Sequence, residues 1–243
     1  MAKLYFDNVS IHYPIFNSRT MSIRNQLVRI ATGGIIEREE GGVQIVSALN
    51  NVSFQISDGD AVGLVGHNGA GKSTLLRTMA GVYAPATGHI TREGRVATLF
   101  DMGAGIDPEL SGRENIWRMG FLLGMSRTQI NDEMSAIEDF TQLGDFLELP
   151  MRTYSTGMAM RLMFAVATST APEILLVDEV FGTGDFEFQK KAKVRMQTLL
   201  QSVKILVFAS HAMTLVREHC NRFFHLEHGV VREIDESELN QFE

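Results

Sequence analysis

Nine consecutive residues, Gly66 to Thr74, limit what this chain can fold into more than any other part of the sequence. They read Gly-His-Asn-Gly-Ala-Gly-Lys-Ser-Thr and fit G-x-x-x-x-G-K-[ST], the pattern of a phosphate-binding P-loop. The apolar residues 61–65 before them predict a buried strand, and residues 75–80 after them predict a helix that stops at Gly81. The motif needs this order of strand, loop and helix, because inward-facing N–H groups and the helix N-terminus bind phosphate together.

The loop residues have predicted roles at a bound nucleotide. Lys72 is expected to reach the β- and γ-phosphates, and the Ser73 hydroxyl is expected to ligate Mg²⁺. The sequence therefore predicts ATP and Mg²⁺ as cofactors. The predicted nucleotide contacts in the loop are His67, Asn68, Gly69, Ala70, Gly71, Lys72, Ser73 and Thr74. The alternative is a glycine turn that matches by chance, but the complete motif and its flanks favour the nucleotide site.

Composition and charge exclude several classes of protein. The chain has 243 residues, 44% hydrophobic and 21% charged, as in one large soluble domain or two small ones. Its net charge of −7 argues against a phosphate-backbone partner, so we expect no nucleic acid. The single cysteine, Cys220, excludes an internal disulfide and a multi-cysteine metal site. The longest aliphatic runs, such as residues 174–177 and 205–209, are too short to span a bilayer, so a membrane process would need spans from another chain.

The order of the apolar runs predicts an α/β fold. Strands are expected at residues 3–13 and within residues 43–56, with a polar, glycine-containing insert at residues 16–42 between them. Residues 107–169 have a helical, methionine-rich pattern, and we expect their methionines to fill a core. The tail, residues 222–233, reads as a hairpin.

Two later apolar strands, residues 174–177 and 205–209, each end near a charged or titratable residue and precede a helix. Such alternation predicts a mainly parallel sheet with its active site at the carboxyl ends of the strands. Asp178, after the first strand, is expected to hold Mg²⁺ directly or through water. Glu179 can then orient and deprotonate the attacking water. Without the P-loop, this pair would read as a helix N-cap and a first-turn acid.

His211 follows the second of these strands. A lone histidine is usually a surface residue or a satisfied core residue. Beside a phosphate site, however, it could contact the γ-phosphate and report its presence.

The segment Tyr154-Ser155-Thr156-Gly157-Met158 precedes an apolar helix. Ser155 or Thr156 can serve as an ordinary N-cap of that helix. The same hydroxyl and helix N-terminus can also bind a phosphate. The two interpretations are compatible.

These elements, in this order, resemble the ATP-binding cassette (ABC) ATPases over nearly the whole chain. Residues 154–158 stand where the family has L-S-G-G-Q, Asp185 stands at the D-loop aspartate, and His211 stands at the switch histidine. The resemblance implies a P-loop NTPase with a mainly parallel sheet core, an antiparallel β subdomain and an inserted α-helical subdomain. It implies a single nucleotide-binding domain, residues 1–243, divided into an ATP-binding core, 1–106 plus 171–243, and a helical signature subdomain, 107–170.

The resemblance also implies a homodimer that sandwiches two ATP molecules. Each P-loop then faces Ser155, Thr156 and Gly157 of the partner chain, so these three residues are expected to contact the nucleotide. Lys72, Glu179 and His211 are the implied catalytic residues.

Departures from the usual family pattern narrow the resemblance. The glutamine loop of the family falls near Asp101, but no glutamine stands there, and Asp101 either replaces it as a Mg²⁺ contact or only caps a turn. The ATPase subunits of bacterial polysaccharide exporters look similar to this chain at residues 103–105, 111–115, 180–185 and 188–191. That group implies an ATPase that powers export of a lipid-linked glycan, such as O-antigen, through a separate multi-spanning permease.

The same group implies a peripheral position on the cytoplasmic side of the inner membrane, with the glycan handled by the permease. The alternatives are an ABC ATPase for another exported substrate, a soluble ABC-type switch on nucleic-acid machinery, and a P-loop kinase. One P-loop per chain and the net charge of −7 argue against the switch. A kinase gives no reason for residues 155–157 or for His211.

Tyr13 is the candidate for the aromatic residue that stacks on adenine, because the family carries one after its first strand. Tyr5 and Phe16 compete with it, and a buried strand tyrosine is the alternative. In the insert, Ile23 and Leu27 have helical spacing with Ile30. This stripe suits a helix that contacts the permease or the membrane, or equally one packed on the core of this domain.

Overall fold

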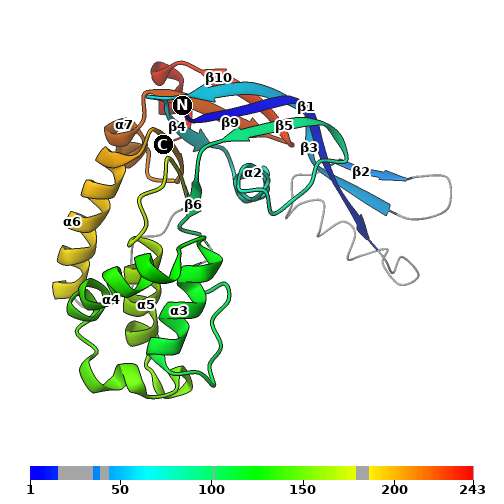
Figure 1. The fold of residues 1–243 in the computed structure, drawn as a ribbon. Coiled ribbons are helices and arrows are strands. Elements are labelled where there is room, and N and C mark those ends of the chain that lie inside the picture. Colours follow the sequence, from blue (N-terminus) through cyan, green and yellow to red (C-terminus); the bar gives the residue numbers. More distant parts are fainter. Residues whose placement is uncertain (16–34, 39–43, 101, 179–185, 243) are drawn as a thin grey trace. The chain divides into compact units, whose positions relative to one another are not determined.

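The computed structural model describes residues 1–15, 35–38, 44–100, 102–178 and 186–242 (Figure 1). These residues form two compact units. The first consists of Met1–Val96, Leu176–Glu179 and Lys204–Glu243, and the second of Ala97–Leu175 and Val180–Val203, as far as these ranges are described.

An antiparallel sheet in the first unit carries the N-terminal strands. It has the order β2-β3-β1-β5, formed by β1 (Lys3–Ile15), β2 (Ile35–Arg38), β3 (Gln44–Ser57) and β5 (Thr87–Glu93). Leu4 and Phe6 of β1 are fully buried, as their alternation in the sequence predicts. The strands predicted at residues 3–13 and 43–56 are therefore confirmed, and the second is a single long strand.

A second sheet has the order β10-β9-β4-β8-β7-β6. Its strands are β4 (Ala61–Val65), β6 (Val96–Thr98), β7 (Ile174–Asp178), β8 (Ile205–Ala209), β9 (Arg222–Glu227) and β10 (Val230–Ile234). β4 runs parallel to both β8 and β9, while β9 and β10 form the predicted antiparallel hairpin. Because parallel strands end at one edge, the P-loop after β4 and His211 after β8 come close together.

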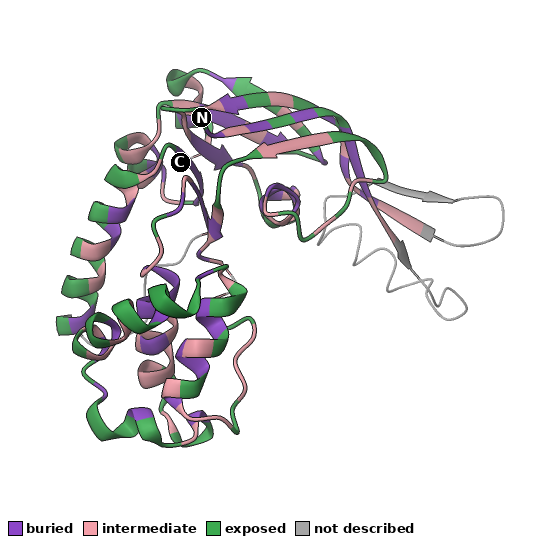
Figure 2. Ribbon diagram, viewed as in Figure 1, coloured by how far each residue is buried: buried purple, intermediate pink, exposed green. Residues whose placement is uncertain are grey.

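Helix α2 (Lys72–Met79) contacts β3 of the first sheet and β8 of the second. Its Leu75, Leu76 and Met79 are completely buried. Figure 2 shows buried residues in purple on both sheets of this unit. The helix begins at Lys72 rather than at the predicted residue 75. Gly71 explains the difference: its φ of 110° turns the chain, so that the last residues of the motif already form the first helical turn. Further along the chain, this unit contains α7 (Met213–His219) and the short η3 (Glu236–Phe242).

The second unit is mainly helical. It contains α3 (Gly112–Leu122), α4 (Arg127–Thr141), η1 (Gly144–Glu148), η2 (Met151–Thr153), α5 (Thr156–Ala167) and α6 (Phe186–Ser202). Its core buries Met119, Met125 and Met151, and Met134, Met158 and Met163 pack against the same cluster. The expectation that these methionines fill a core is thus confirmed for these six residues.

A buried asparagine organises the start of α3. Asn115 is fully buried, accepts a hydrogen bond from the Asp107 N–H at 2.9 Å, and donates to the carbonyls of Asp107, Leu110 and Ser111. Ser111 and Glu114 form a capping box at the same helix end. The motif at residues 111–115 therefore has a structural role, since it fixes the loop that enters α3.

Among the residues that the structure describes, no helix has both the length and the apolar character of a membrane-crossing segment. The helix predicted around Ile23, Leu27 and Ile30 of the insert lies outside the described residues. Of the insert, the structure describes β2. The end residues of this strand, Ile35 and Arg38, pair with Ser47 and Gln44 of β3, respectively.

Candidate functional site

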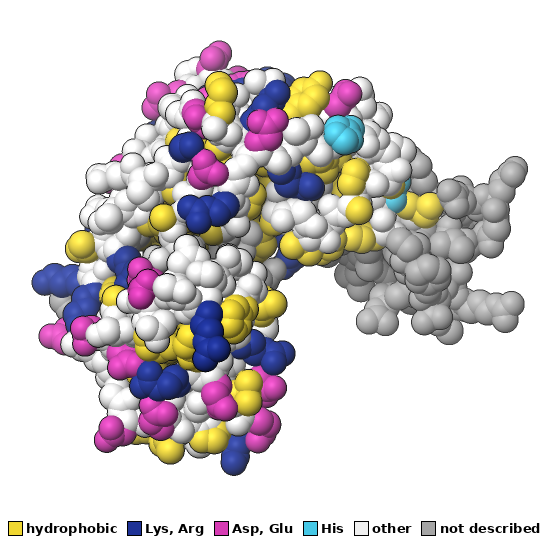
Figure 3. Space-filling view, in the orientation of Figure 1, with side chains coloured by type: hydrophobic (Ala, Val, Ile, Leu, Met, Phe, Trp, Pro, Cys, Tyr) yellow, Lys and Arg dark blue, Asp and Glu magenta, His cyan; other side chains and the backbone are white. Residues whose placement is uncertain are grey.

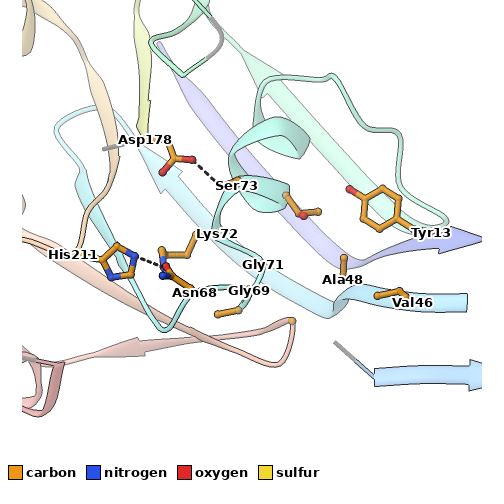
Figure 4. Close-up of a pocket in the computed structure, with 13 residues that line it drawn as sticks. Tyr13, Val46, Ala48, Asn68, Gly69, Gly71, Lys72, Ser73, Asp178 and His211 are labelled. Carbon is orange, nitrogen blue, oxygen red and sulfur yellow. Dashed lines mark hydrogen bonds between the residues drawn. The ribbon is translucent and has the colours of Figure 1, made fainter. Parts of the chain in front are cut away.

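A cavity of about 400 Å³ lies around the P-loop in the first unit (Figure 4). This volume is within the usual range of small-molecule sites. The cavity is lined by Tyr13, Val46, Ala48, Asn68, Gly69, Ala70, Gly71, Lys72, Ser73, Thr74, Asp178, His211 and Gly229. The structure thus brings together most of the predicted P-loop contacts with Tyr13, Asp178 and His211.

The shape of the loop depends on glycines in close contact with other segments. A Cβ on Gly66 would lie 2.2 Å from the Leu226 carbonyl oxygen, and one on Gly71 would lie 2.8 Å from the Ala48 carbonyl oxygen. No side chain caps α2 at Gly71. The N-terminus of α2 thus has no side-chain cap that would compete with an anion, which suits a phosphate site at a helix N-terminus.

Lys72 lies along the inside of the loop, with only 8% of its surface exposed. Its ammonium donates to the carbonyls of Gly66 at 2.6 Å and His67 at 3.2 Å. Its Nζ also lies 3.4 Å from Nε2 of His211 (Figure 4). A positive charge and an imidazole therefore meet at one end of the cavity, where they can contact phosphate oxygens.

Two oxygen ligands lie close together at the start of α2. The Ser73 hydroxyl donates to Oδ2 of Asp178, the last residue of β7, at 2.8 Å (Figure 4). A hydroxyl and a carboxylate are hard oxygen donors, which suit Mg²⁺ when phosphates and water supply its other ligands. Within the described ranges, no group of three or more His, Cys, Asp or Glu side chains could hold a metal ion. Ser73 and Asp178 are therefore the candidate Mg²⁺ ligands among the described residues, and the remaining ligands of a metal would come from outside this set.

Tyr13, Val46 and Ala48 lie at the other end of the cavity (Figure 4). Burial is the main cause that raises the pKa of Tyr13 to about 12, so its hydroxyl is neutral at physiological pH. The Tyr13 ring meets the Tyr83 ring edge-on, with centroids 5.5 Å apart. This end offers an aromatic ring and small apolar side chains, which suit a flat base.

His67 lies in the loop but does not line the cavity. Its Nδ1 is 2.8 Å from the Asn68 carbonyl oxygen, and its ring lies 5.6 Å from that of His228. The His67 backbone carbonyl accepts a hydrogen bond from the Lys72 ammonium, and this bond connects His67 to the site.

Ser155, Thr156 and Gly157 lie in the second unit, at the start of α5, and do not line this cavity. Ser155 is the N-cap, and its Oγ accepts from the Met158 N–H at 3.2 Å. The N-cap interpretation is therefore confirmed for Ser155. The cavity of a single chain forms without these residues.

Four predicted residues lie outside the described residues: Asp101, Glu179, Asp185 and Phe16. Tyr5, the other competitor for the adenine contact, is 37% exposed on β1 and lies under the Lys3 ammonium. It does not line the cavity.

Sequence reasoning missed Val46, Ala48 and Gly229. Gly229 sits in the β9–β10 turn with a φ of 77°, and it donates to the Ala70 carbonyl at 3.2 Å. A Cβ there would lie 2.8 Å from the Ala48 carbonyl oxygen. The sequence indicates the turn, since His228 and Gly229 separate two strands, but nothing in it indicates that the turn contacts the P-loop.

A family model described as ABC transporter matches residues 49–182. The O-antigen export system ATP-binding protein RfbE of Yersinia enterocolitica is 59% identical over 233 residues, covering 96% of this chain and 98% of that protein. An O-antigen export system ATP-binding protein RfbB of Klebsiella pneumoniae is 36% identical, covering 96% of this chain and 93% of its own length. The teichoic acids export ATP-binding protein TagH of Listeria innocua is 35% identical over 97% of this chain and 67% of its own length.

Solved structures are similar over almost the entire chain. An ATP-binding subunit of an ABC transporter has a TM-score of 0.68 at 20% identity, covering 98% of this chain and 92% of that one. A dimeric ATP-binding cassette in a post-hydrolysis state, with ADP and Pi, has a TM-score of 0.66 at 21% identity, covering 96% and 98%. These likenesses confirm the predicted α/β fold with its P-loop core, antiparallel β subdomain and helical insertion.

Proposed function

The chain belongs to the ABC transporter family and is an ATP-hydrolysing subunit. We propose that it powers export of a lipid-linked polysaccharide such as O-antigen. A separate multi-spanning permease carries the glycan, and this chain is peripheral on the cytoplasmic side of the inner membrane. The observation that carries the proposal is the 59% identity to an O-antigen export ATP-binding protein over nearly the full length of both chains.

The chemistry follows from the charges around the cavity. The Lys72 ammonium and the N–H groups of the first turn of α2 bind the phosphates. Ser73 and Asp178 hold Mg²⁺, which neutralises phosphate charge when it is bound. Glu179, next in sequence, removes a proton from the attacking water, and His211 contacts the γ-phosphate from beside Lys72.

The test is a purification from the native membrane with a tag on this chain. We expect a multi-spanning membrane protein to co-purify, and we expect cells without this chain to accumulate lipid-linked glycan on the cytoplasmic side. Co-purification with nucleic-acid machinery instead would favour a soluble switch. A permease of another substrate class, with glycan export intact, would favour a different exporter.

We further propose that two copies of the chain together form two ATP sites. Each site combines the P-loop of one copy with Ser155 of the other. A mixed dimer of one Lys72→Ala chain and one Ser155→Arg chain should keep one intact site and bind ATP. A dimer with both changes in one chain and none in the other should keep none.

The control is Ser126→Arg in place of Ser155→Arg. Ser126 caps α4 as Ser155 caps α5, accepting from the Gln129 N–H at 3.2 Å. Each change removes a cap worth about 1 kcal/mol, so the control separates lost helix stability from lost ATP contact. Equal ATP occupancy in the two arrangements of the Ser155 dimers would contradict the composite site.

The end of α3 is our proposed contact for the permease. Phe121 and Leu122 are 54% and 65% exposed, and the Phe121 ring lies 5.9 Å from the Trp117 ring. Arg127 lies over Trp117, and Arg118 donates to the Gly105 carbonyl. In Figure 3, hydrophobic and basic side chains lie next to one another on the surface of the mainly helical second unit. An exposed apolar patch with a charged rim is typical of a protein contact.

Phe121→Asp with Leu122→Asp should therefore separate this chain from the permease. Each side chain contributes about 1.5–3 kcal/mol when buried, so we expect at least about a tenfold loss of affinity. The ATPase rate of the isolated chain should not change. The matched control is Val194→Asp on α6, where the side chain is 63% exposed. Permease co-purification measures the effect, and retention equal to the control would contradict this surface.

A further inference from the structure

Tyr83 lies in the segment between α2 and β5 and contacts Tyr13, which lines the end of the cavity that suits a base (the base end). Its ring is half-buried and meets the Tyr13 ring at a centroid distance of 5.5 Å and an interplanar angle of 79°. Tyr13 lines the cavity, whereas Tyr83 does not. Tyr83 therefore supports Tyr13 from outside the space that a ligand would occupy.

The hydroxyl groups add a second connection. The side chains of Thr74 and Tyr83 both act on the Tyr13 hydroxyl. Thr74 lowers the pKa of Tyr13 and Tyr83 raises it, while burial is the largest cause of the net rise. Figure 4 shows the Tyr13 hydroxyl pointing towards α2, the helix that carries Thr74.

The contact with Tyr83 restrains the Tyr13 ring. The edge-on contact with the Tyr83 ring limits the tilt of the Tyr13 ring. Val46 and Ala48 line the same end of the cavity and leave room beside the ring for a flat base. A ring held in place before the ligand arrives loses less side-chain entropy on binding.

We infer that Tyr83 is a positioning residue for the nucleotide base, which acts by holding Tyr13 in its stacking orientation. This inference rests on the proposed function, since it takes ATP as the ligand and Tyr13 as its base contact. Tyr83 itself touches neither base nor phosphate.

The experiment compares a ligand that has a base with one that does not. For Tyr83→Ala, Tyr83→Phe, Tyr13→Ala and the Tyr13→Ala/Tyr83→Ala double variant, we would measure kcat and KM for ATP and the inhibition constant of inorganic tripolyphosphate. Tyr5→Ala is the matched control, because Tyr5 lies on the same strand as Tyr13 but outside the cavity. Thermal unfolding of each variant confirms that it is folded.

Tyr13→Ala should raise the KM for ATP about five- to 150-fold, the range for loss of a base–aromatic stack. Tyr83→Ala should raise it about two- to tenfold, the range for loss of an edge-to-face aromatic pair. Tyr83→Phe should raise it less, because the ring contact remains. The kcat value and tripolyphosphate inhibition should stay unchanged, and Tyr83→Ala should add nothing in the Tyr13→Ala background.

Three results would overturn the inference, and they are distinguishable. If Tyr13→Ala raises the KM for ATP but Tyr83→Ala and Tyr83→Phe do not, Tyr83 has no positioning role while the base site stands. If Tyr83→Ala weakens tripolyphosphate as much as ATP, its role is structural. If Tyr13→Ala leaves the KM for ATP unchanged while tripolyphosphate still binds, the base lies elsewhere and Tyr83 loses its proposed role with it.

Discussion

Replacing Lys72 by alanine should remove ATP binding and ATP hydrolysis together. The Lys72 ammonium is held by the carbonyls of Gly66 and His67, at 2.6 and 3.2 Å, at the edge of the cavity. A hydrogen bond to a charged group contributes about 1.5–3 kcal/mol. With two phosphates to contact, the loss should be about 3–6 kcal/mol, or roughly 10²–10⁴ in ATP affinity.

Calorimetry with ATP-Mg measures this effect, and Lys190→Ala is the control. Lys190 is an exposed lysine on α6, outside the cavity, so its loss should leave ATP affinity unchanged. Because Lys72 also bonds the loop carbonyls, thermal unfolding should be measured in parallel. Unchanged ATP affinity in folded Lys72→Ala protein would contradict the P-loop assignment.

Local patterns predicted the main elements of this fold because each depends on nearby residues. The buried strands β4, β7 and β8 are short apolar runs, and a strand buried on both faces has this pattern. The β9–β10 hairpin was indicated by His228 and Gly229 between two apolar runs. Asp178 lies within hydrogen-bond distance of Ser73, as expected for residues that follow strands of one parallel sheet, and their Mg²⁺ role stays a prediction.

The base end of the site could not be predicted in the same way. Val46 and Ala48 reach the cavity through the pairing of β3 with β1, and Gly229 reaches it through the contact of a distant turn with Ala70. Such contacts between remote segments leave no periodic signal in the chain. Tyr83 is a similar case, because an isolated tyrosine between α2 and β5 gives no indication of its ring contact with Tyr13.

The motif at residues 111–115 has a structural explanation that does not depend on the resemblance to polysaccharide exporters. It was one of the features that pointed to polysaccharide exporters, yet in the structure its Asn115 is a buried residue that satisfies three backbone carbonyls. A buried amide with all its partners in place stabilises one loop conformation, and losing it would leave those carbonyls unpaired. The motif therefore supports the fold of the helical unit and says nothing by itself about the glycan.

Glu179→Gln should leave ATP binding intact and nearly abolish hydrolysis. Asp178, directly before it, accepts from Ser73 at the start of α2, and its place at the end of β7 is the edge where the phosphates would bind. Glutamine keeps the size and hydrogen-bonding capacity of glutamate but cannot take a proton. Loss of a general base lowers the rate by about 10²–10⁴.

Because Glu179→Gln should still bind ATP, its oligomeric state with ATP-Mg should differ from that of Lys72→Ala. If ATP holds two chains together and hydrolysis separates them, the Glu179→Gln protein should accumulate as an ATP-bound dimer, detectable by size-exclusion chromatography with ATP-Mg. Lys72→Ala should remain monomeric under the same conditions, because it does not bind the nucleotide. The control Glu187→Gln removes an exposed glutamate in the first turn of α6 and should hydrolyse ATP at the wild-type rate. Wild-type turnover by Glu179→Gln would remove Glu179 from the mechanism and leave the water to be activated by another group.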